Sequence, residues 1–171
     1  MRSMKHLGAL VVSSVTVFLL LTACENGSSP TQPPTLPPDT ELQTVYSAKS
    51  TGIHTRGGEI ILTEERWEEV WAAIQAGSGT PDAPAPSIDF STDMLILAGM
   101  GDEPDSCWNL RITEVRPEVA KIRVDVSETR PPLDCACPAV VIQPVHVVRV
   151  SREELPGEFD YRKTITGPGC N

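Results

Sequence analysis

Hydrophobic and polar residues alternate in several short stretches of this chain, the pattern of strands that bury one face. In residues 108–113 polar residues separate Trp108, Leu110 and Ile112, and residues 122–126 repeat the alternation. Further strand-like runs lie at residues 44–50, 59–62, 94–100, 140–150 and 159–166. The pattern predicts an α+β fold, a mainly antiparallel β-sheet with one principal helix packed on it.

The principal helix is expected directly after Thr63, whose hydroxyl can cap a helix N-terminus. Glu64 and Glu65 follow it at the positive end of the helix dipole. Gly77 is a plausible stop. The apolar residues at helical spacing, which form the face that packs on the sheet, are Trp67, Val70, Trp71 and Ile74.

Two other runs are informative about the sheet. Residues 94–100 are almost continuously apolar, which predicts a central strand covered on both faces. Pro144 interrupts residues 140–150, and because proline cannot donate to a β-ladder it predicts an edge, a bulge or a break. Ser151 is expected to cap a single helical turn that ends at Leu155.

The N-terminus has the pattern of a bacterial lipoprotein signal. Arg2 and Lys5 precede an apolar run that is shorter than a membrane-spanning helix. The run ends in Leu21-Thr22-Ala23-Cys24, a lipobox in which the Cys24 thiol receives the lipid and becomes the first mature residue. The chain is therefore expected to be anchored to a membrane through lipidated Cys24.

Three segments follow from this pattern. Residues 1–23 are the signal peptide, and residues 24–41 carry the lipidated Cys24 and a tether rich in Pro, Ser and Thr. Residues 42–171 form a single α+β domain. The expected location is the bacterial cell envelope, with the domain on the extracytoplasmic side, in the periplasm or on the cell surface.

The charge balance argues against nucleic-acid partners. The chain has 14 Lys and Arg against 23 Asp and Glu. Removal of Arg2 and Lys5 with the signal peptide leaves 12 basic residues against the 23 acidic ones, a formal charge of −11. Phosphate backbones repel such a surface.

Four cysteines remain after Cys24 is lipidated, in a compartment that favours disulfides. They are Cys107, Cys135, Cys137 and Cys170. A bridge between Cys135 and Cys137 would be strained, so one of them should pair with Cys107 and the other with Cys170. The alternative is a metal site, but Cys-Ala-Cys lacks the two-residue spacer of zinc motifs. No metal and no cofactor are expected.

No catalytic motif stands out in the sequence. His146 lies in an apolar strand, where a histidine is usually structural, and His54 lies in a short polar connection. A non-enzyme is therefore favoured. The alternatives are an extracytoplasmic hydrolase or metal-dependent enzyme that uses His146 with nearby carboxylates, and a purely structural envelope protein.

The order of these features resembles the C-terminal domain of PrcB, a protease-complex subunit. The resemblance covers residues 59–150 and rests on the Trp67/Trp71 helix, Asp89-Phe90 before the apolar strand, residues 112–115 and residues 143–150. It implies an accessory lipoprotein domain that binds a secreted or surface protease complex and is not itself the protease.

A protein-binding surface is expected where the helix does not cover the sheet. The candidates are the opposite face of the sheet, the loop at residues 101–106 and the edge around Pro144. Glu103, Asp105 and Arg130 are the expected partner-binding residues. Their substitution should weaken partner capture with little effect on stability.

We predict that Cys24→Ser leaves a soluble protein or an uncleaved precursor with its domain still folded, because the anchor and the predicted core share no residue. Detergent phase partitioning measures this, with the wild-type protein as the control. A variant that remains in the detergent phase with its signal peptide removed would contradict the lipobox assignment.

Overall fold

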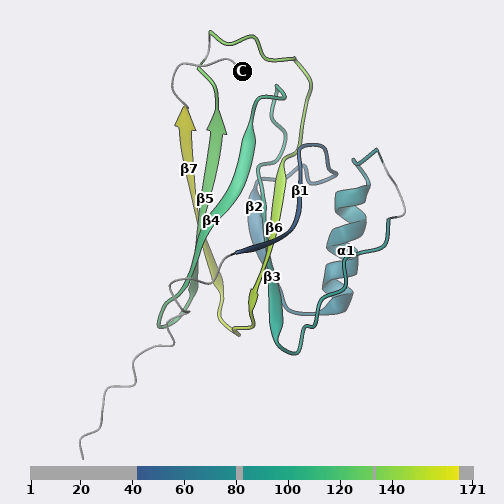
Figure 1. Ribbon diagram of the computed structural model, residues 1–171, viewed down its shortest axis with the longest axis vertical. Coiled ribbons are helices and arrows are strands. Elements are labelled where there is room, and N and C mark those ends of the chain that lie inside the picture. Colours follow the sequence, from purple (N-terminus) through teal and green to yellow (C-terminus); the bar gives the residue numbers. More distant parts are fainter. Residues whose placement is uncertain (1–41, 80–82, 133, 166–171) are drawn as a thin grey trace, which may run out of the picture. The chain divides into compact units, whose positions relative to one another are not determined.

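The computed structural model describes residues 42–79, 83–132 and 134–165, which form seven strands and one helix (Figure 1). The elements are β1 Gln43–Ala48, β2 Gly57–Ile61, α1 Glu64–Gln75, β3 Asp93–Gly99, β4 Asn109–Pro117, β5 Ile122–Arg130, β6 Val145–Ser151 and β7 Gly157–Ile165. The predicted signal peptide, the tether, Cys24 and Cys170 lie outside these residues. Within them, the helix is too short and too polar to cross a bilayer.

The strands form two mostly antiparallel sheets instead of the one sheet that was predicted. The first has the order β1-β6-β3-β2 and the second the order β4-β5-β7. All pairs are antiparallel except β5 with β7, which is parallel. The alternation of apolar residues shows which face of a strand is buried, but it does not show which sheet the strand joins.

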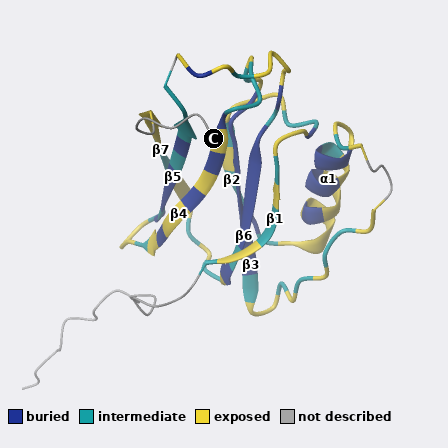
Figure 2. Cartoon of the chain, turned by 45° about the horizontal axis from the view of Figure 1, so that its top comes forward, coloured by how far each residue is buried: buried dark blue, intermediate teal, exposed yellow. Residues whose placement is uncertain are grey.

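The four-stranded sheet lies between α1 and the three-stranded sheet (Figure 1). Leu95 and Leu97 of β3 pack in the core on the helix side, whereas Met94, Ile96 and Ala98 pack in the core between the sheets. The same division holds along β6, and both strands are buried along most of their length (Figure 2). The prediction of a central strand covered on both faces is confirmed.

The helix begins as predicted, with the Thr63 hydroxyl accepting a hydrogen bond from Arg66 N at 3.2 Å. Each buried indole also finds an acceptor, because Trp67 Nε1 donates to Pro86 O at 2.9 Å and Trp71 Nε1 donates to Ala83 O at 2.6 Å. The loop that follows the helix is thereby held against it.

Gly77 follows the helix because of close backbone packing, not because of a left-handed backbone conformation. A Cβ at this position would lie 2.1 Å from Thr51 O, so the close approach of the two backbones requires glycine. The described glycine with a positive φ is Gly101, at 76°.

Near β6, the structure selects the break among the three alternatives predicted for Pro144 and contradicts the helical turn predicted after Ser151. β6 lies between β1 and β3 and is not an edge. Pro144 precedes its first residue, and its carbonyl accepts a hydrogen bond from Met100 N. Ser151 caps no helical turn, because it is the last residue of β6 and pairs with Asp93.

These corrections reduce the surface available to a partner. The three-stranded sheet covers the face of the four-stranded sheet that is opposite the helix, and among the described strands none offers a free edge at Pro144. Of the three predicted regions, the loop at residues 101–106 remains accessible.

Candidate functional site

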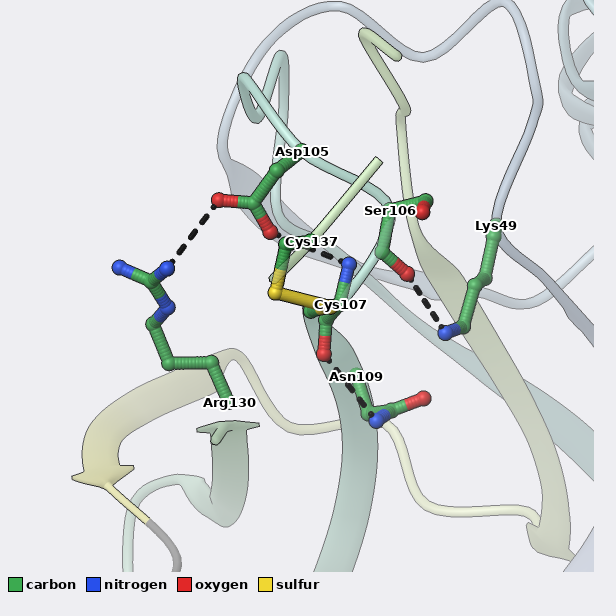
Figure 3. The surroundings of a disulfide bond; sticks show 7 residues. All are labelled: Lys49, Asp105, Ser106, Cys107, Asn109, Arg130 and Cys137. Carbon is green, nitrogen blue, oxygen red and sulfur yellow. Dashed lines mark hydrogen bonds and ion pairs between the residues drawn. A yellow bond between two sulfur atoms is a disulfide. The ribbon is translucent and has the colours of Figure 1, made fainter. Parts of the chain in front are cut away.

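A disulfide holds together the two segments that carry most of the predicted site residues. Cys107, just before β4, is bonded to Cys137, in the segment after β5, across a sequence separation of 30 (Figure 3). Of the two pairings that the sequence left open for Cys107, the structure contains this one. Cys135 is also disulfide-bonded. Its predicted partner, Cys170, lies outside the described residues.

Backbone hydrogen bonds join the same two segments. Glu103 and Ile142 form a β-bridge, with N-to-O distances of 2.9 and 3.0 Å, and Ser106 N donates to Pro138 O at 3.1 Å. Lys49 Nζ, from the end of β1, donates to Ser106 O at 2.9 Å (Figure 3). We call residues 101–107 and 134–142 the clamped end, because these links restrain both segments.

Asp105 and Arg130 bind each other instead of pointing into solvent. Asp105 Oδ2 lies 3.3 Å from Arg130 Nη2, and Asp105 Oδ1 accepts a hydrogen bond from Cys107 N at 3.1 Å (Figure 3). Their side chains are only 15% and 17% exposed, respectively. They therefore position the loop on β5, and any influence on a partner acts through the shape of the clamped end.

Glu103, the third predicted partner-binding residue, is half-buried beside this ion pair. Burial raises the pKa of its carboxyl above the usual range, with the charges of Glu128 and Asp105 acting in the same direction and that of Lys163 opposing them. The structure thus places the three predicted residues near one another, although only Asp105 and Arg130 form an ion pair with each other.

An ion pair between a buried carboxylate and a partly exposed arginine lies near Glu103 and was not predicted from the sequence. Glu128 of β5 is fully buried, with Oε1 2.6 Å from Arg56 Nη1, and the guanidinium of Arg56 stacks over the Tyr161 ring at 4.6 Å. Glu128 falls on the same alternating face as Val124 and Val126, so the strand pattern contained the signal for its burial. Removal of one partner would leave the other charge uncompensated.

Trp108 is flanked by two cations at the same end of the molecule. The guanidinium of Arg130 lies 5.2 Å and the ammonium of Lys163 lies 5.1 Å from its ring centroid. Such contacts are worth about 0.5–2 kcal/mol each. They attach the start of β4 to the ends of β5 and β7.

The clamped end offers little to a metal ion. Among the described residues, the acidic, histidine and cysteine side chains close enough to share one are Asp105, Cys107 and Cys137. Both sulfur atoms belong to the disulfide, so neither provides a thiolate ligand while the bridge is intact. Asp102 instead binds His54 at 2.9 Å and Gln143 at 2.8 Å, in an exposed cluster that the sequence analysis also missed.

His146 links the two sheets. Its Nδ1 lies 3.0 Å from Ile112 N, and its Nε2 lies 3.1 Å from Thr44 Oγ1. Because an amide N–H can only donate, Nδ1 is the acceptor and Nε2 carries the proton. Burial, with a contribution from the charge of Arg111, lowers the pKa of His146 to about 4. These contacts give the imidazole a structural role at the junction of the two sheets.

No protein-family model matches this chain, and the comparisons with curated proteins and with solved structures gave no match. The function of the clamped end therefore has to be inferred from its own geometry. The resemblance to PrcB stays a prediction.

We predict that His146 makes the stability of the domain depend on pH. Its pKa falls from 6.5 to about 4 on folding, so the unfolded chain binds the proton first as the pH decreases. The stabilisation is complete above about pH 6.5 and is lost progressively toward pH 4. The total loss should be roughly 3 kcal/mol in the free energy of unfolding.

Urea unfolding at a series of pH values measures this dependence. His146→Gln is the matched variant, because its amide oxygen can still accept from Ile112 N but does not titrate. We expect the variant to lack this part of the pH dependence. Identical slopes for both proteins between pH 6.5 and 4 would contradict the assignment.

Proposed function

We propose that this protein is a non-catalytic, membrane-tethered lipoprotein that binds a protein partner on the extracytoplasmic side of a bacterial envelope. Lipidated Cys24 and the Pro-rich tether would hold the domain at the membrane. The clamped end is the proposed recognition surface.

The observation that carries this proposal is the exposure of two valines on a restrained segment. Val140 and Val141 are 55% and 61% exposed, whereas adjacent Ile142 is buried and pairs with Glu103. Scattered exposed valines are common, but these two are consecutive and lie just after the disulfide at Cys137. Ile165, at the end of β7, adds a third exposed apolar residue near the end of β5.

Restraint of the segment makes it suited to binding. Ordering a flexible loop on association costs about 0.5–1.5 kcal/mol for each side chain that becomes immobile. At the clamped end, the disulfide and the Glu103–Ile142 bridge already restrict the backbone. A partner would then bury the valines with a smaller loss of conformational entropy.

The resemblance to PrcB supports one class of partner, a protease complex of the envelope or cell surface. In that case the domain would act as an accessory subunit that holds the complex near the membrane. The acidic net charge of the chain fits a protein partner better than nucleic acid.

We predict that a photo-reactive amino acid at position 141 crosslinks to a discrete protein partner in the native envelope. The same residue at position 119 is the control, because Val119 is 84% exposed in the turn at the opposite end of the β4–β5 hairpin. Val141→Asp should weaken binding of the isolated partner at least tenfold, about 1.4 kcal/mol, with an unchanged melting temperature.

Two outcomes would contradict the proposal. One is equal crosslinking from positions 119 and 141, which indicates nonspecific contact. The other is no saturable crosslink from position 141, which favours a purely structural envelope protein.

A further inference from the structure

A cleft lies along the β4 edge of the three-stranded sheet, where β4 meets β1 and β6 of the four-stranded sheet. Its volume is about 470 Å³, and its lining comes from β1, β4, β5 and β6. Five hydroxyl side chains line it, namely Thr44, Ser47, Thr113, Ser127 and Thr129. This concentration of hydroxyl groups makes the cleft different from the apolar cores on either side of the four-stranded sheet.

Arg111 is the charged residue of this lining. No Asp or Glu belongs to the described residues that line the cleft, and within the described chain Arg111 has no carboxylate in ion-pair contact. Arg116 and Arg123, on the same sheet, both bind Asp125. An arginine without a counter-charge is notable in a chain with 23 acidic and 14 basic residues.

Several hydroxyl groups are available to donate. His146 Nε2 donates to Thr44 Oγ1, so the hydroxyl hydrogen of Thr44 is left for another acceptor. Ser127 and Thr129 are half-buried neighbours on the face of β5 opposite Val126, and they make no side-chain hydrogen bond to another described residue. Thr113 differs, because its hydroxyl already donates to Asp125 O at 3.1 Å.

We propose that this cleft binds a compact oxyanion, a carboxylate, sulfate or phosphate group, with Arg111 as its counter-charge and the Thr44, Ser127 and Thr129 hydroxyls as hydrogen-bond donors. Guanidinium groups bind such oxygens through parallel N–H donors, and hydroxyls complete the shell. Neighbouring carboxylates would repel the anion, and the lining has none. This site is independent of the protein-binding surface proposed at the clamped end.

The test is an NMR titration of the mature, isotope-labelled lipoprotein in detergent micelles. Sodium sulfate, sodium phosphate and sodium acetate are added in parallel, with sodium chloride keeping the ionic strength constant. We expect at least one anion to cause saturable shifts of the Arg111 side chain, the Ile112 amide and the Thr44 amide. The anion that saturates at the lowest concentration identifies the preferred group.

Arg111→Gln should weaken this binding at least tenfold. The matched control is Arg66→Gln, which removes the same charge from the exposed surface of α1, where Arg66 binds Glu59 and Glu69. The control should bind the anion as tightly as the wild type. Thr129→Val is a second cleft variant, expected to weaken binding without removal of a charge.

Absence of saturable shifts for all three anions would overturn the proposal. Equal losses for Arg111→Gln and Arg66→Gln would also overturn it, because they would show a response to net charge alone. Should Arg111→Gln fail to fold, Thr129→Val decides the matter, and unchanged binding in that variant counts against the site.

Discussion

The packing of the two sheets depends on one hydrogen bond, from the backbone N–H of Ile112 to the imidazole of His146. Without it, this N–H would be buried without a partner. Ile112 is 1% exposed and lies on β4, an edge strand of the three-stranded sheet, with its N–H directed toward His146 of the other sheet. A buried donor left unpaired costs about 1–3 kcal/mol. His146 supplies the acceptor, and its own N–H is satisfied by Thr44. An uncharged imidazole in this tautomer thus connects β1, β6 and β4.

Polar side chains lie at three places around the core between the two sheets. His146 and the hydroxyl-lined cleft lie on the side of β1 and β4. Tyr161 of β7 lies on the other side, where its hydroxyl contacts the carbonyl oxygens of Gly57 and Gly99. The clamped end, with the Cys107–Cys137 bridge, restrains the loops that precede β4 and follow β5. A core braced in this way holds the clamped end, the proposed recognition surface, at one end of the strands.

The sequence predicted the elements whose signals are local. The cap at Thr63 and the helical spacing of Trp67 and Trp71 located α1, and the apolar run of residues 94–100 located β3 and its burial on both faces. Alternation also identified β4 and β5. Each of these signals depends on neighbours within a few residues.

Features that depend on distant residues were not predicted. The split into two sheets and the parallel pairing of β5 with β7 depend on contacts between strands far apart in sequence. Pro144 indicated a discontinuity in the strand. It did not indicate that β6 would begin directly after it, in the interior of a sheet. The Asp105–Arg130 pair shows the same limit for the site, since the sequence indicated functional charges and the fold turned them toward each other.

The most direct test of this account is the protonation state of His146 in the folded protein. Nitrogen NMR of the labelled imidazole, with a scalar coupling measured across the bond from Ile112 N to His146 Nδ1, reports both tautomer and contact. The account predicts a neutral ring with its proton on Nε2, a detectable coupling and a pKa of about 4. A ring that takes up its proton near pH 6.5, or one without coupling to Ile112, would contradict it.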